Sequence, residues 1–207
     1  KGLAIDPGPM FCACLSQAQM GVQDIHAVLA THAHDDHCQD MDQILALGHK
    51  LEDRLGIAHK IRCAGSNTVV GRFDQLFSEN GITPIRVSRG NTGELHTALS
   101  EIGFSISGIE ATSVVHDETP WLWHGTPTTG FGVVLAMERS GGGTVTVGYT
   151  SDTAFHDGLV ESFSDCQILI ANVGNYFPGP NEPRHLGRDG TVNLVGSLLR
   201  EGSLELV

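Results

Sequence analysis

Three histidines and two aspartates lie within six residues of the segment Thr31–Cys38, which reads T-H-A-H-D-D-H-C. His32 and His34 are two residues apart, so an extended or turning backbone places both rings on one side. Asp36 and His37 follow at the entrance of the next expected helix, which allows two neighbouring metal pockets. Imidazole and carboxylate groups suit zinc, iron or manganese. Helix capping would explain one acidic residue but not three histidines, so the segment predicts a metal site.

The overall composition is that of a globular chain. The 207 residues are 40% hydrophobic and 17% charged, which predicts a single domain with a substantial core over residues 1–207. Both ends fall in expected strands, so we expect a domain that is incomplete at its N- and C-termini. No apolar run reaches the roughly 20 residues of a membrane span. The five cysteines form no regular framework, which favours a reducing, cytoplasmic location.

Apolar periodicity predicts an alternating order of strands and helices, a β-rich middle and a final α/β part, hence two sheets with helices outside them. The expected strands are Gly2–Ile5, Ile25–Ala30, Lys60–Cys63, Ile85–Ser88, Phe104–Val115, Gly130–Glu138, Thr144–Tyr149 and Gln167–Val173, and the expected helices are Asp40–Leu55, Ser66–Asn80 and Val192–Arg200. The glycine-rich segment Ser140–Gly143 predicts a hairpin loop between two of these strands.

The histidine segment resembles the H-x-H-x-D-H motif of the metallo-β-lactamase superfamily, and the I-D-P-G loop at Ile5–Gly8 resembles the flanking part of that family. The resemblance implies an α/β fold, the four-layer αββα sandwich with two mixed β-sheets, with edge elements missing from this chain. It also implies two divalent metal ions, zinc before manganese or iron. His32 and His34 would bind one ion, and Asp36 and His37 the other; Asp36 would in addition orient the nucleophile.

The same resemblance implies further ligands along the chain. A third histidine is expected after a strand, which favours His116 over its rival His124. Asp152 lies in a Y-T-S-D-T segment that resembles the family's Y-S-G-D-T, with Ser151 where glycine is common, and it would bridge the two metals. His185 resembles the catalytic histidine of ribonuclease Z relatives and would act on the leaving group. Alternatively, His185 is itself the last metal ligand.

The resemblance favours hydrolysis of a phosphodiester or related phosphoester by a metal-activated water. Transfer RNA is disfavoured as a partner, because the interval between His116 and Asp152 is short and the formal charge is −12. A small-molecule phosphoester fits better as the substrate. We expect no membrane partner, and the sequence leaves a homodimer possible. The alternatives are a thioester or lactone hydrolase of the glyoxalase II or lactonase kind, and a non-catalytic module that binds a metal or ligand.

Overall fold

The computed structural model describes residues 1–56, 58–112, 114, 130–174, 185–202 and 204, and the chain divides into two compact units. Unit 1 comprises Lys1–Val87 and Thr97–Phe104, and unit 2 comprises Ser88–His96 and Ser105–Val207. The described residues form one four-stranded sheet in each unit, so the expected α/β class with two sheets is confirmed. That all 207 residues form one domain stays a prediction.

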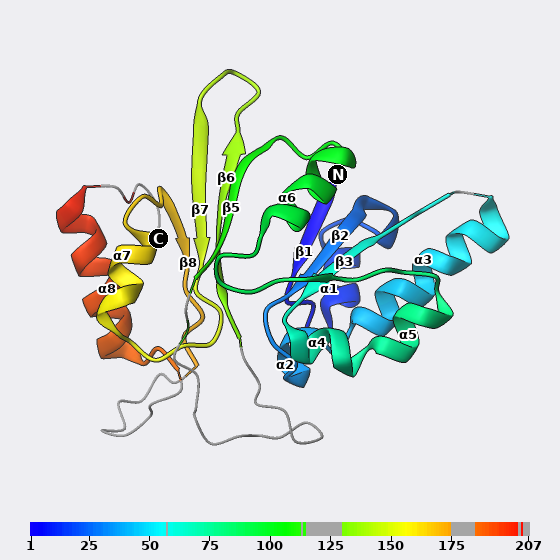
Figure 1. The fold of residues 1–207 in the computed structure, drawn as a ribbon, viewed down its shortest axis with the longest axis horizontal. Coiled ribbons are helices and arrows are strands. Elements are labelled where there is room, and N and C mark those ends of the chain that lie inside the picture. Colours follow the sequence, from blue (N-terminus) through cyan, green and yellow to red (C-terminus); the bar gives the residue numbers. More distant parts are fainter. Residues whose placement is uncertain (57, 113, 115–129, 175–184, 203, 205–207) are drawn as a thin grey trace. The chain divides into compact units, whose positions relative to one another are not determined.

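The sheet of unit 1 is parallel throughout its described strands (Figure 1). Its order follows the chain: β1 (Gly2–Ile5), β2 (Ile25–Ala30), β3 (Arg62–Gly65) and β4 (Ile85–Arg86). In β2 every residue except His26 is buried, as expected for an inner strand of a parallel sheet. The sequence led us to expect a mixed sheet. The strands are instead parallel because each connection between them carries at least one helix.

The long helix of unit 1, α3 (Met41–Leu55), confirms the predicted helix to within one residue. Its buried side chains include Met41, Ile44 and Leu45, whose spacing of three and four residues defines one face toward the core of the unit. The helix ends at Gly56, whose φ of 65° is a left-handed conformation that glycine adopts without steric cost.

The single helix predicted over Ser66–Asn80 is two shorter ones, α4 (Asn67–Arg72) and α5 (Asp74–Glu79). The Ser66 hydroxyl caps the start of α4 by accepting the backbone N–H of Val69. The break falls at Phe73, which has φ −104° and ψ 15° and a partly buried side chain packed against the core. The segment therefore forms two helices with a partly buried aromatic residue at their junction.

The sheet of unit 2 is mixed, as predicted. Its strands follow the chain order β5 (Ile106–Thr112), β6 (Gly132–Glu138), β7 (Thr144–Tyr149) and β8 (Ile168–Ile170). The first three pair antiparallel, and β8 is parallel to β7. The predicted glycine hairpin joins β6 to β7, and Arg139 and Gly143 close it with an N–H···O bond of 2.9 Å. Gly142 and Gly143 take φ values of 88° and 85°, which explains the glycines.

Helix α8 (Arg188–Glu201) starts four residues before the predicted Val192, and its residues Leu194 and Leu198 are fully buried in the core of unit 2. Three further helices were not predicted, because their 7 to 9 residues offer too few turns for a clear periodicity. They are α1 (Phe11–Gln17), α6 (Gly93–Glu101) and α7 (Asp157–Phe163), and the short elements η1 (Val22–Asp24) and α2 (Asp35–Cys38) complete the described structure.

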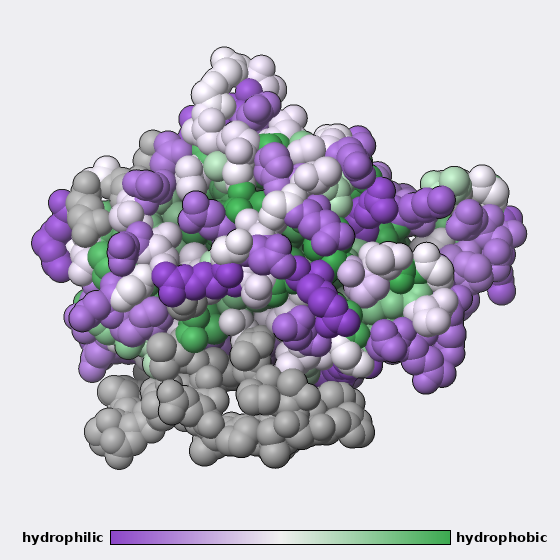
Figure 2. Space-filling model, viewed as in Figure 1, coloured by the Kyte–Doolittle hydropathy of each residue, from purple (hydrophilic) through white to green (hydrophobic). Residues whose placement is uncertain are grey.

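Hydrophilic residues cover most of the face drawn in Figure 2, in keeping with the net charge of −12. Among the helices of the described ranges, none has both the length and the apolar character that crossing a bilayer requires. The cytoplasmic location stays a prediction.

Candidate metal centre

The three motif histidines gather where β2 ends and α2 begins. His32 follows the strand and is fully buried, His34 is the residue that precedes α2, and His37 lies within α2 with 3% exposure. The ring centroids of His32 and His34 are 4.7 Å apart, and those of His32 and His37 are 4.1 Å apart. The structure therefore brings these three predicted ligands together within unit 1.

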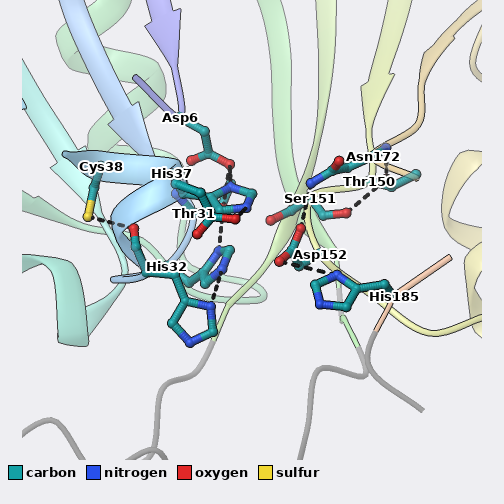
Figure 3. A network of polar contacts seen from close by, with 12 residues as sticks. Asp6, Thr31, His32, His37, Cys38, Thr150, Ser151, Asp152, Asn172 and His185 are labelled. Carbon is teal, nitrogen blue, oxygen red and sulfur yellow. Dashed lines mark hydrogen bonds and ion pairs between the residues drawn. The ribbon is translucent and has the colours of Figure 1, made fainter. Parts of the chain in front are cut away.

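Asp6, at the end of β1, orients two of these rings through hydrogen bonds (Figure 3). One oxygen accepts the Thr31 backbone N–H at 2.7 Å, and the other accepts the Thr31 hydroxyl at 2.7 Å and faces His37 Nδ1 at 2.8 Å. The Thr31 hydroxyl, which donates to Asp6, also lies 3.1 Å from His32 Nδ1. In the tautomer with the proton on Nδ1, both imidazoles donate to these oxygens and present Nε2 to a metal.

The donor spacing fits a metal ion. His32 Nε2 and His34 Nδ1 lie 3.2 Å apart. Two nitrogen ligands of one tetrahedral zinc would lie roughly 3.3 Å apart, given Zn–N distances of about 2.0–2.1 Å. Asp6, His32 and His37 also offer one ligand atom each within 4.8 Å of one another. Since Asp6 already accepts from Thr31 and His37, we assign it as the group that orients the ligands rather than as a ligand.

Two small residues pack closely against the backbone of the motif. A Cβ atom on Gly8 would lie 1.9 Å from the backbone oxygen of Asp36, so only glycine fits in the I-D-P-G loop. The Cys38 thiol donates to the backbone oxygen of His34 at 3.0 Å. Burial raises the pKa of Cys38 to about 12, which favours the neutral thiol that this hydrogen bond requires.

Asp36 differs from the histidines, because its side chain is 70% exposed. Its carboxylate lies 3.6 Å from His37 Nε2, at the entrance of α2 where the sequence placed it. The predicted third histidine, His116, and its rival His124 lie outside the described residues. Their role as ligands stays a prediction.

In unit 2, Asp152 follows the carboxyl end of β7 and is 2% exposed. Its carboxylate accepts a hydrogen bond from the Asn172 side-chain amide, and its other oxygen lies 3.4 Å from His185 Nδ1 (Figure 3). The preceding Ser151 takes φ 56°, the left-handed conformation that explains why glycine is common in the related segment. The predicted pair Asp152 and His185 therefore lie in contact.

Two further residues complete this group. The backbone N–H of Asn172, just beyond β8, donates to the Thr150 hydroxyl at 3.0 Å, which fixes the side-chain amide toward Asp152. A Cβ atom on Gly174 would lie 2.5 Å from Cγ of His185, so the imidazole occupies the space that a side chain would need.

The sequence analysis missed the residues that orient the donors. The sequence offered a signal for Asp6, because a carboxylate directly after a buried strand and before Pro7 is a candidate for orienting nearby side chains. Asn172 had a weaker one, as a polar residue that ends an apolar run. Arg72, which contacts the motif backbone, had none. Such contacts depend on which loops the fold brings together, and sequence spacing alone does not show that.

Comparison with known proteins gives the class of the chain. A family model described as "Beta-lactamase superfamily domain" matches residues 3–201. The chain therefore belongs to the beta-lactamase superfamily, and its two four-stranded sheets with their helices have the metallo-β-lactamase fold.

Individual relatives agree with this assignment. The protein designated Uncharacterized protein MJ1374 of Methanocaldococcus jannaschii is 26% identical over 210 residues, covering 97% of this chain and 67% of that protein. The metallo-beta-lactamase fold protein YhfI from Bacillus subtilis has a TM-score of 0.68 at 16% identity, over 99% of this chain and 73% of YhfI. The short form of human tRNase Z has a TM-score of 0.59 at 13% identity, over 99% and 84%. At such identities the two structures show a shared fold alone.

Proposed function

We propose that this protein is a metal-dependent hydrolase that cleaves a phosphodiester or a related phosphoester with a metal-activated water. The observation that carries the proposal is the pair of nitrogen atoms His32 Nε2 and His34 Nδ1, which lie 3.2 Å apart, with His32 fully buried and His34 partly buried. The Nδ1 atoms of His32 and His37 face the Thr31 hydroxyl and the Asp6 carboxylate, and such contacts favour the tautomer in which Nε2 binds a cation. The chain belongs to a superfamily whose members are generally hydrolases, which supports the proposal of a hydrolase.

The proposed cofactor is a pair of divalent ions, zinc before manganese or iron. His32 and His34 would hold one ion, and Asp36 and His37 the other. The superfamily resemblance adds Asp152 as the bridging carboxylate and His116 as a further ligand. When bound, such ions lower the pKa of a water molecule and polarise the phosphoryl oxygen.

The chain's own residues supply positioning and proton transfer. The carboxylate of Asp36, which is 70% exposed, is the group proposed to orient an attacking water. His185 is the proposed general acid for the leaving oxygen, because its side chain keeps 27% exposure while Nδ1 lies 3.4 Å from Asp152.

A phosphoester substrate is supported by the structural neighbours, which include human tRNase Z and a long-form RNase Z from yeast. The yeast protein has a TM-score of 0.63 at 12% identity, and the match covers 90% of this chain and 28% of the yeast chain. The net charge of −12 disfavours a broad contact with RNA. We therefore propose a small phosphodiester rather than tRNA.

The test combines metal analysis with turnover. Bound metal per chain is measured by plasma mass spectrometry in the parent and in a His32→Ala/His34→Ala variant, and hydrolysis of bis-p-nitrophenyl phosphate is followed in both. The matched control is His49→Ala, which removes a histidine of unit 1 whose side chain is 61% exposed and pairs with Asp53. We expect about two ions in the parent and the control, clear loss in the double variant, and hydrolysis that follows the metal.

Each other outcome has a definite meaning. Metal binding without hydrolysis of the diester, but with cleavage of a thioester or lactone, would replace the phosphoester proposal by the second hydrolase class. Metal binding without any turnover would favour a binding module. A folded, metal-supplemented parent that binds no metal would contradict the hydrolase proposal.

A further inference from the structure

Helix α4 begins beside the strand that leads into the metal-binding motif and ends at a residue that contacts the motif. At its start, the Ser66 backbone N–H donates to the oxygen of Ala30, the last residue of β2, at 3.3 Å. At its end lies Arg72, whose side chain is 18% exposed. The helix thus carries one arginine back to the loop that follows β2.

The Arg72 guanidinium contacts the residues on both sides of His34. One nitrogen, Nη1, donates to the backbone oxygen of Ala33 at 2.6 Å. The other, Nη2, donates to the carboxylate of Asp35, the first residue of α2. The planar fork of a guanidinium can make two such contacts at once in a fixed geometry, which a lysine cannot. Arg72 therefore fixes the chain just before and just after His34.

His34 needs this support more than the other histidines do. His32 is fully buried and His37 is 3% exposed, and their rings are held through Thr31 and Asp6. His34 is only partly buried, so packing restrains its ring less. We propose that Arg72 is a positioning residue that holds His34 in place for metal binding. The inference rests on the proposed metal-dependent function and concerns a residue outside its ligand set.

The two contacts of Arg72 do not contribute equally to holding the motif. Asp35 is 71% exposed, and an exposed ion pair stabilises little. The bond to the Ala33 carbonyl acts on the backbone that carries His32 and His34. Loss of Arg72 should therefore weaken metal binding more than loss of the Asp35 charge.

The test is a cobalt(II) titration of the metal-free protein, followed by visible absorption. Arg72→Met removes both contacts and keeps a side chain of similar length. Arg72→Lys keeps the positive charge but not the planar fork, and Asp35→Asn removes the ion pair but leaves the hydrogen bond to the Ala33 carbonyl. The matched control is Arg86→Met, since Arg86 contacts Asn67 at 3.4 Å and not the motif. We expect roughly 10-fold weaker cobalt affinity for Arg72→Met, which is the scale of effects from residues that orient metal ligands. We expect a smaller loss for Arg72→Lys and little change for Asp35→Asn and Arg86→Met.

A second measurement separates this inference from the proposed function. Amide hydrogen exchange of the metal-free protein reports the bonds His37 N–H to His34 O and Gln39 N–H to Asp35 O, which are 3.1 and 2.9 Å long. We expect faster exchange at both amides in Arg72→Met and not in Arg86→Met. A parent that binds no cobalt would contradict the proposed function, while faster exchange would still support the role of Arg72 in ordering the motif.

Other results overturn the inference. Unchanged cobalt affinity in Arg72→Met would show that Arg72 does not position a ligand, whatever the exchange data show. If Arg72→Met does not fold, Arg72→Lys decides the question, because full parental affinity there would mean that the two-pronged contact is not required.

Discussion

The two units each place donor groups beyond the carboxyl end of a strand, but they assemble them differently. In unit 1 the histidines come from one segment of six residues after β2. In unit 2, Asp152 follows β7, Asn172 follows β8, and His185 precedes α8, so that 33 positions separate the first residue from the last (185 − 152). One group is local in sequence and the other is gathered by the fold.

The difference also appears in how the donors are held. His32 and His37 are fixed by hydrogen bonds through Thr31 and Asp6 in a buried setting. The Asp152 carboxylate is buried as well, yet its partner His185 keeps 27% exposure and sits next to residues outside the described ranges. A preformed set of ligands suits metal binding, whereas an accessible imidazole suits proton transfer to a substrate.

The largest expected effect tests the metal-binding role of unit 1. His32→Ala should remove bound metal and lower kcat/KM by more than the roughly 100-fold that an outer-shell change costs. Asp152→Asn should lower turnover as strongly but retain more metal, because the histidines remain. Plasma mass spectrometry and diester hydrolysis measure both. Equal metal loss in the two variants would break the distinction between the units.

A smaller effect is expected for the residue that orients the histidines. Asp6→Asn replaces a charged acceptor by a neutral amide, so cobalt affinity should fall by about 10- to 100-fold. Stability should fall too, because three hydrogen bonds converge on a carboxylate that is 4% exposed. Cobalt titration and urea denaturation are the measurements. Unchanged affinity would show that the Asp6 carboxylate is not needed to orient the rings.

The corresponding residue of unit 2 should matter less for metal. Asn172→Ala removes one hydrogen bond to Asp152, and we expect roughly a 10-fold loss in kcat with little change in metal content. Far-UV circular dichroism of the variant distinguishes this local effect from a general loss of structure, since only the latter changes the spectrum. An Asn172→Asp variant serves as the isosteric comparison.

The smallest effect concerns the buried thiols. Burial raises the pKa of Cys38 to about 12 in unit 1 and that of Cys166 to about 11 in unit 2, from 9.0. Because the folded chain keeps these protons longer than the unfolded chain, the stability they contribute is complete below pH 9 and is lost as pH rises toward 11–12. Urea denaturation at pH 8 and pH 10.5 should show a loss of roughly 1 kcal/mol per thiol and pH unit. Cys166→Ala should flatten this dependence, and an unchanged slope would contradict it.

Sequence reasoning found what is local in the chain. The motif histidines, the glycine hairpin and α3 follow from short-range patterns, and the family resemblance supplied Asp152 and His185. Helix breaks and the contacts of Asp6, Asn172 and Arg72 were not found, because they depend on which segments meet in the folded chain. The break at Phe73, whose partly buried ring packs against the core of unit 1, was likewise not found.

Gly8 carries no functional group, yet its place in the fold has a consequence for any library of variants. The 1.9 Å that separates a hypothetical Cβ from the Asp36 oxygen leaves no room even for alanine. In a saturation library selected for activity, position 8 should therefore be depleted of all substitutions as strongly as the histidines, while its neighbour Pro9, which is exposed, tolerates exchange. Selection would thus mark Gly8 as essential, although its only contribution is that it has no side chain where the backbone of Asp36 lies.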